Sequence, residues 1–125
     1  MTERTPDTMA HSPGLPAPTR TSYALLTGAS QGIGAAMARD LAARGYNVIL
    51  VARRQDVLES IAAELRAQHE VDAIALAADL SETADVSRVI EFMSAKEISI
   101  IVNSAGIASF GAFMDQDWDL SLIHI

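Results

Sequence analysis

Three glycines after a short apolar run have the spacing needed to hold a nucleotide pyrophosphate. Gly28, Gly32 and Gly34 closely follow the apolar run 23–27. Gly28 permits a tight turn, Gly32 lets the backbone approach a phosphate, and Gly34 allows a helix to pack closely on the strand. The apolar residues that follow have helical spacing, so the free N–H groups and positive dipole end of that helix would face the ligand. The alternative is a glycine-rich turn that serves only packing.

Two arginines further along indicate which dinucleotide would be bound. Arg53 and Arg54 follow a second apolar run, 47–51, about 20 positions after the glycines. At this point of a βαβ unit a carboxylate binds the ribose hydroxyls, whereas arginine can bind a 2′-phosphate through charge-assisted hydrogen bonds. Because Ala52 stands where the carboxylate is expected, the sequence favours NADP(H) over NAD(H). The alternative is that both arginines are solvated residues at a helix start, where the helix dipole disfavours positive charge.

An aspartate after a third apolar run allows two interpretations. Asp79 and Leu80 follow the run 72–77, at the edge where open α/β sheets bind ligands. The Asp79 carboxylate could accept a hydrogen bond from the amino group of adenine. It could equally accept hydrogen bonds from backbone N–H groups of the turn, while Ser81 caps the next helix.

A fourth apolar run, 98–102, ends in the small polar sequence Asn103-Ser104-Ala105-Gly106. Small residues at this point let a loop pass close to a cofactor, and an asparagine amide can join neighbouring strands. Segments with helical spacing of apolar residues separate the runs, at 56–68 and 87–93 as well as after the glycines. Buried strands that alternate with helices predict an α/β domain with a parallel sheet.

Taken together, these motifs resemble those of the short-chain dehydrogenase/reductase family. The sequence TGASQGIG at 27–34, the pair Asp79-Leu80 and the sequence NSAG at 103–106 occur in the family's order. The resemblance implies a three-layer Rossmann fold, with a parallel sheet in the strand order 3-2-1-4 that is flanked by helices and incomplete in its C-terminal half. On this basis residues 22–125 are the N-terminal part of an NADP-binding domain, and residues 1–21 are a tail.

The resemblance also implies which residues contact the cofactor. They belong to the pyrophosphate loop, the end of the second strand, the adenine pocket and the ribose motif. In that order they are Gly28, Ser30, Gln31, Gly32, Ile33 and Gly34; Arg53 and Arg54; Asp79 and Leu80; and Asn103, Ala105 and Gly106. Two positions depart from the family's pattern. Ser104 replaces an asparagine, and Gln31 replaces the basic residue of many NADP-preferring members, so the cofactor preference depends on the strand-end arginines.

Members of this family transfer hydride between a nicotinamide cofactor and a carbonyl or alcohol carbon, with a tyrosine as acid or base. In the family a lysine four residues later lowers the pKa of this tyrosine, and a nearby cation is needed because the ordinary tyrosine pKa is about 10. Tyr23 is followed at that distance by Thr27 and Tyr46 by Leu50, so we assign no catalytic residue in this chain. Residues 117–125 resemble the start of the family's long helix after the fourth strand. We therefore expect an N-terminal fragment that is inactive alone and a full-length protein that is a homo-oligomer.

The missing tyrosine–lysine pair leaves a second function open. A non-catalytic nucleotide-binding or interaction module would also suit this chain. A methyltransferase would need a carboxylate at the end of the second strand, which Ala52 and Arg53 do not provide. In a fragment, the outer edge of the strand at 98–102 would be uncovered, and an apolar edge of this kind promotes aggregation.

The composition excludes several classes of protein. Half of the residues are hydrophobic and the net charge is −7, which argues against a nucleic-acid partner. No apolar run reaches the roughly 18 residues that span a bilayer, so we expect no membrane partner. The chain has no cysteine, and His11, His69 and His124 lack ligand spacing, so we expect no metal site. Residues 1–20 are rich in threonine and proline without an apolar signal sequence, which predicts a disordered tail and a cytoplasmic protein.

Overall fold

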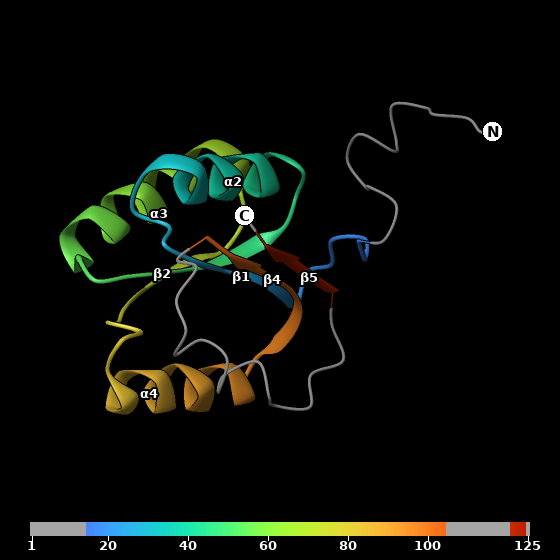
Figure 1. Ribbon diagram of the computed structural model, residues 1–125. Helices are drawn as coiled ribbons and strands as arrows, with labels where there is room; N and C mark the ends of the chain where they lie inside the picture. The colour runs from blue at the N-terminus through green and yellow to red at the C-terminus, as the bar shows by residue number, and fades with distance from the viewer. Residues whose placement is uncertain (1–14, 105–120, 125) are drawn as a thin grey trace.

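The strands of the molecule form a parallel sheet in the order β3-β2-β1-β4-β5 (Figure 1). The computed structural model describes residues 15–104 and 121–124. Its strands are β1 (Ser22–Thr27), β2 (Asn47–Ala52), β3 (Ala73–Ala77), β4 (Glu97–Asn103) and β5 (Ser121–His124). Its helices are α2 (Gly32–Ala43), α3 (Gln55–His69) and α4 (Thr83–Ser94). The predicted strands and their order 3-2-1-4 are confirmed, with strand ends that differ by one residue at most.

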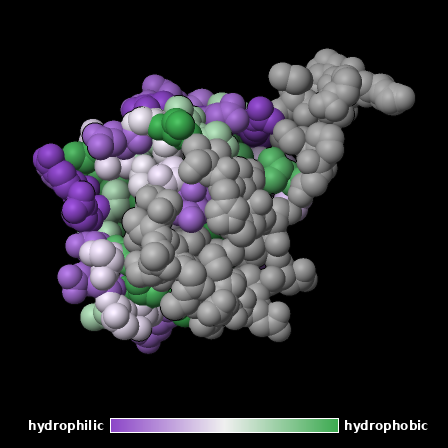
Figure 2. Space-filling view, viewed as in Figure 1, coloured by the Kyte–Doolittle hydropathy of each residue, from purple (hydrophilic) through white to green (hydrophobic). Residues whose placement is uncertain are grey.

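Helices cover both faces of the sheet, and each face has its own apolar core. In Figure 1, α2 and α3 lie above the sheet and α4 lies below it. Val48 and Leu50 of β2 belong to the core on the side of α2 and α3, whereas Ile49 and Val51 belong to the core under α4. Because successive strand residues point to opposite faces, a strand covered on both sides is apolar throughout. The outward side of α3 is polar, as the hydrophilic side chains over it in Figure 2 show.

The fifth strand corrects two expectations about the end of the chain. β5 pairs in parallel with β4, from Ile100 opposite Ser121 to Asn103 opposite His124. The expected uncovered edge of β4 and the expected helix are therefore wrong for residues 121–124, while residues 117–120 and 125 lie outside the described part. The physical reason is that a strand edge presents unpaired N–H and C=O groups, which an extended segment satisfies.

Residues 15–21, which the sequence placed in the tail, contact the start of β2. The hydroxyl of Tyr46 donates a hydrogen bond to the carbonyl of Pro16. The Asn47 amide donates to the carbonyls of Thr19, Arg20 and Ser22. These bonds hold the segment before β1 against the amino-terminal edge of the sheet, opposite the edge where the strands end.

Two kinds of feature are missing from the described ranges, 15–104 and 121–124. No helix there has the length and apolar character needed to cross a membrane. The same ranges contain no group of three or more histidine, cysteine, aspartate or glutamate residues that could hold a metal ion.

Candidate nucleotide-binding site

A cavity of about 840 Å³ opens at the carboxyl ends of β1 to β4. Ligand pockets in proteins usually measure about 300–1,000 Å³, so this cavity is large enough for a cofactor. Ligands of open α/β sheets bind at this edge. The lining consists of Gly28, Ser30, Gln31, Gly32, Val51, Ala52, Arg53, Arg54, Val57, Ala78, Asp79, Leu80, Ser81 and Ser104.

The loop between β1 and α2 brings a helix N-terminus to the cavity. Gly28 and Gly32 have φ angles of 63° and 62°, in the left-handed region that glycine adopts without strain. α2 begins at Gly32, and its N-cap residue, Gln31, forms no side-chain hydrogen bond with the helix. The first N–H groups of α2 therefore lack a side-chain cap and can donate to an anion.

Gly34 lies under this loop, where there is no room for a side chain. A Cβ on Gly34 would lie 2.1 Å from the carbonyl oxygen of Gly28 and 2.6 Å from the Oγ of Ser104. The Ser104 hydroxyl in turn donates a hydrogen bond to the carbonyl of Thr27. The close packing of the helix on the end of β1, which the sequence predicted for Gly34, is present.

The two arginines at the end of β2 differ in their partners. Arg54 is the N-cap of α3 and forms an ion pair with Asp56, with 3.0 Å between Nη2 and Oδ2. Its hydrogen bond to the Asp56 carboxylate lowers the pKa of that group. Arg53 is exposed and forms no hydrogen bond or ion pair with residues 15–104. Of the two guanidinium groups that line the cavity, the one of Arg53 therefore has no hydrogen-bond or ion-pair partner among residues 15–104.

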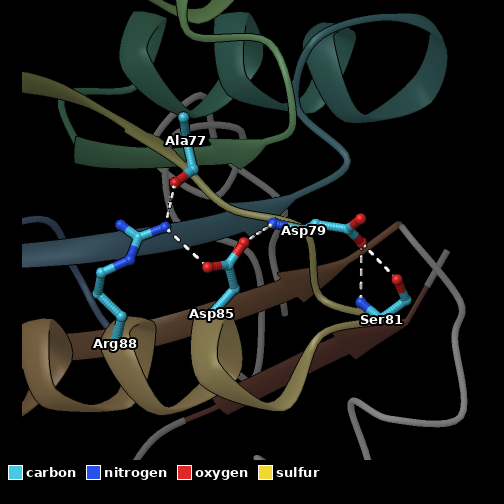
Figure 3. Close-up of polar contacts among 5 residues, drawn as sticks. All are labelled: Ala77, Asp79, Ser81, Asp85 and Arg88. Atoms are coloured by element: carbon cyan, nitrogen blue, oxygen red, sulfur yellow. Dashed lines mark hydrogen bonds and ion pairs between the residues drawn. The ribbon is translucent and has the colours of Figure 1, made fainter.

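Asp79 accepts hydrogen bonds from its own turn (Figure 3). The N–H and the hydroxyl of Ser81 donate to Asp79 Oδ1 over 3.0 and 2.6 Å. These bonds are the main cause of the lowered pKa of Asp79, with a smaller contribution from the charge of Arg53. The N-cap of α4 is Glu82, so Ser81 does not cap that helix as one interpretation had it. The turn contacts of Asp79 are thus present, and its contact with adenine stays a prediction.

Three of the predicted contact residues are not in the lining of the cavity. Ile33 is 58% exposed, whereas Gly34 and Asn103 are buried. The Asn103 Oδ1 accepts a hydrogen bond of 3.0 Å from the hydroxyl of Thr27. This bond joins β4 to β1, which is the strand-joining role that the sequence suggested for an asparagine at this position.

Two predicted residues, Ala105 and Gly106, lie outside the described part of the chain. Sequence reasoning also missed lining residues, most of which stand at or just after a predicted strand end. Their place at the carboxyl end of a predicted strand, where open α/β sheets bind ligands, could have identified them. The missed residues are Val51, Ala52, Val57, Ala78, Ser81 and Ser104.

Comparisons with known proteins agree with the fold and with the predicted family. A family model described as short chain dehydrogenase matches residues 22–124. A very-long-chain 3-oxoacyl-CoA reductase of Pyrenophora tritici-repentis is 37% identical over 93 residues, which are 71% of this chain and 27% of that protein. The inactive hydroxysteroid dehydrogenase-like protein 1 of Homo sapiens is 34% identical over 110 residues, which are 82% of this chain and 33% of that protein.

Solved structures give the same picture. A short-chain dehydrogenase from Sphingobium yanoikuyae in complex with NADPH is 41% identical to this chain, with a TM-score of 0.66. The match covers 77% of this chain and 38% of that one. The chain therefore spans well under half the length of the proteins that it matches.

Proposed function

This chain belongs to the short-chain dehydrogenase family, and from that premise we propose that it binds NADP(H) as the cofactor-binding part of an oxidoreductase. The observation that carries the proposal is a single cavity lined by both the glycine loop and Arg53. The whole protein would transfer hydride between the nicotinamide ring and a carbonyl or alcohol carbon. A reductase and a dehydrogenase among its relatives support this class of reaction.

The diphosphate of the cofactor would bind at the N-terminus of α2. The N–H groups there lack a side-chain cap, and the positive end of the helix dipole favours an anion. Space is available beside the backbone, because a Cβ on Gly32 would meet no atom within 4 Å. A phosphate can therefore come close to the N–H groups of the loop.

The 2′-phosphate of NADP(H) would bind to Arg53. Its guanidinium is exposed at the cavity and can form two charge-assisted hydrogen bonds with one phosphate. Ala52 precedes it, so no carboxylate stands at the strand end to bind the ribose hydroxyls or to repel the phosphate. The NADPH bound to the Sphingobium relative supports this preference.

The adenine ring would lie against Asp79 and Leu80. Leu80 is buried and contributes an apolar surface to the cavity lining. Both hydrogen bonds from Ser81 go to Oδ1 of Asp79, and Oδ2 receives none from residues 15–104. An aspartate is ionised near neutral pH, and the lowered pKa of Asp79 favours this state further, so Oδ2 can accept a bond from the adenine amino group.

Hydride transfer itself needs groups that residues 1–125 do not contain. Neither Tyr23 nor Tyr46 is followed by a lysine four residues later, so we expect residues 1–125 by themselves to catalyse no reaction. A second candidate function is a non-catalytic nucleotide-binding module. The observation that favours it is the human relative, whose name describes it as inactive.

Calorimetry on the complete polypeptide in which this sequence occurs, called the full-length protein below, tests the first proposal. We expect NADPH to bind more tightly than NADH. If neither nucleotide binds, the cofactor assignment is wrong, and if NADH binds equally well, only the preference is wrong. Following NADPH absorbance with a panel of ketones and aldehydes then separates the two candidates, because a non-catalytic module would bind the nucleotide without oxidising it.

A further inference from the structure

Two side chains of α4 reach the end of β3 and hold the backbone that leads into the cavity wall (Figure 3). The Arg88 Nη2 donates a hydrogen bond of 2.7 Å to the carbonyl of Ala77, the last residue of β3. Asp85 accepts a bond of 2.7 Å at Oδ2 from the backbone N–H of Asp79. Arg88 and Asp85 are also joined, with 3.3 Å between Nη2 and Oδ1. Neither residue lines the cavity, so both would act through Asp79.

Two backbone hydrogen bonds also hold this turn. The Ala78 N–H donates to the carbonyl of Ala52 over 2.8 Å, which joins the turn to the end of β2 beside Arg53. The Glu82 N–H donates to the carbonyl of Asp79 over 2.9 Å. The turn that carries Asp79 and Leu80 is therefore fixed before any ligand arrives. A preformed wall spares the ligand the cost of ordering it.

The ion pair between Asp85 and Arg88 by itself contributes little to the stability of the protein. Their side chains are 30% and 49% exposed, and exposed ion pairs stabilise proteins little because solvent screens them. Each residue also forms a hydrogen bond with the backbone that leads into the cavity wall, Asp85 with the N–H of Asp79 and Arg88 with the carbonyl of Ala77. Asp85 also stabilises α4, because an acidic residue in the first turn interacts favourably with the helix dipole. A test has to separate this effect on stability from an effect on the cavity wall.

We propose that Asp85 and Arg88 are positioning residues that set the affinity of the protein for the adenosine end of its dinucleotide. This inference rests on the proposed function. The two side chains hold Asp79 and Leu80 in the conformation that meets the adenine ring. Without them the turn must be ordered by the ligand, and binding of the adenosine end weakens while binding of the nicotinamide end does not.

The same fold offers a matched control at the opposite end of β3. Arg66 of α3 donates from Nη1 to the carbonyl of Ala73, the first residue of the strand, over 2.6 Å. Its Nη2 pairs with Glu59 over 2.7 Å. Arg66 thus makes the same two kinds of contact as Arg88, and neither it nor Glu59 lines the cavity.

The experiment compares Asp85→Ala, Asp85→Asn, Arg88→Ala and Arg66→Ala in the full-length protein. Calorimetry gives the dissociation constants of adenosine 2′,5′-bisphosphate and of reduced nicotinamide mononucleotide, and denaturant unfolding gives the stability. We expect Asp85→Ala and Arg88→Ala to weaken the adenosine ligand about tenfold, the usual effect of one hydrogen bond to a charged group. The nicotinamide ligand should bind unchanged. Asp85→Asn should restore most of the affinity, because its side-chain oxygen can still accept the bond from Asp79.

Amide hydrogen exchange at Asp79 provides a second readout, which should become faster in Asp85→Ala and stay slow in Arg66→Ala. The inference is overturned if the ratio of the two dissociation constants stays at the wild-type value in Asp85→Ala. It is also overturned if Arg66→Ala changes that ratio as much. Should Asp85→Ala not fold, Arg88→Ala decides by the same ratio. Failure of the wild-type protein to bind either ligand would instead contradict the proposed function itself.

Discussion

The hydroxyl of Ser104 donates a hydrogen bond to the main-chain carbonyl of Thr27, and this contact joins the end of β4 to the end of β1. The same hydroxyl oxygen lies 2.6 Å from where a Cβ on Gly34 would stand. The end of β1, the start of α2 and the end of β4 therefore meet at a point without spare volume. This junction sets the position of the helix N-terminus relative to the sheet.

Gly34→Ala should disrupt that junction and the cavity with it. The added Cβ would lie 2.1 Å from the carbonyl oxygen of Gly28, so α2 would have to move away from β1. We expect the free energy of unfolding to fall by about 1–3 kcal/mol, as is usual for an overpacked site. Binding of NADPH should weaken about tenfold for each ~1.4 kcal/mol of contact that the displaced helix loses. Denaturant unfolding and calorimetry measure the two effects.

Gly32→Ala is the matched control for stability. The φ of Gly32 is 62°, so alanine there costs about 1–2 kcal/mol of backbone strain. The substitution causes no clash, because no atom lies within 4 Å of the new Cβ. If Gly34→Ala neither destabilised the protein nor weakened the binding of NADPH, close packing would not explain the glycine at 34.

The fold and the glycine loop could be predicted because their causes are local in the sequence. A strand buried on both faces must be a short apolar run, and Val48 to Val51 is such a run. The register within the sheet could not be predicted in the same way. Tyr23 pairs with Ile98 but Ala24 pairs with Ile100, so Ser99 is an extra residue in β4. Nothing in the alternation of residues there marks this bulge.

The residues of the candidate site could largely be predicted from the sequence, whereas their hydrogen-bond and ion-pair partners could not. Arg53 and Arg54 are identical in type and adjacent in sequence, yet only Arg54 is engaged by Asp56. The bond between Asp85 and the N–H of Asp79 depends on how the turn folds back onto α4. Such contacts follow from three-dimensional geometry, which periodicity and motif spacing do not encode.

Arg53→Asp should shift the preference of the full-length protein from NADPH toward NADH. The substitution removes the guanidinium that would bind the 2′-phosphate and adds a carboxylate that repels it. A hydrogen bond to a charged group contributes about 1.5–3 kcal/mol, so the ratio of the two dissociation constants should change by about 10- to 100-fold. Calorimetry with both nucleotides measures this ratio.

Arg54→Asp is the control for the preceding prediction. Arg54 lines the same cavity but pairs with Asp56 over 3.0 Å, so its loss should change the ratio much less. An unchanged ratio in Arg53→Asp would show that Arg53 does not bind the 2′-phosphate. A larger change in Arg54→Asp would assign that role to its neighbour.

Stability at alkaline pH should depend on Tyr23. Its hydroxyl donates a hydrogen bond to the carboxylate of Asp72, and this bond, with burial and the negative charge, raises the pKa of Tyr23 to about 12. Because an unfolded tyrosine has a pKa of about 10, the stabilisation is full below pH 10 and is lost as the pH rises through about 12. The tyrosine is half-buried and its hydrogen bond to Asp72 is exposed, so solvent screening should keep the effect below about 1 kcal/mol.

Unfolding of Tyr23→Phe and Asp72→Asn at several pH values checks this. Both variants should lose less stability than the wild type between neutral pH and pH 12. Some alkaline dependence should persist, because burial also raises the pKa of Tyr46. Identical pH profiles for wild type and Tyr23→Phe would contradict the prediction.

The buried hydrogen bond between Thr27 and Asn103 should contribute more to the free energy of unfolding than an exposed ion pair does. Both residues are buried, and the Thr27 hydroxyl donates to Asn103 Oδ1 over 3.0 Å. Thr27→Val keeps the shape of the side chain but takes this donor from a buried acceptor, which costs about 1–3 kcal/mol. Asn103→Ala should cost a similar amount, and the double variant should cost about 1 kcal/mol less than the sum of the two. Denaturant unfolding of the four proteins gives this coupling energy. Arg39→Ala, which removes an exposed pair with Glu64, is the comparison and should change stability by less than about 1 kcal/mol. If the effects of Thr27→Val and Asn103→Ala were strictly additive, the bond would not stabilise the junction of β1 and β4.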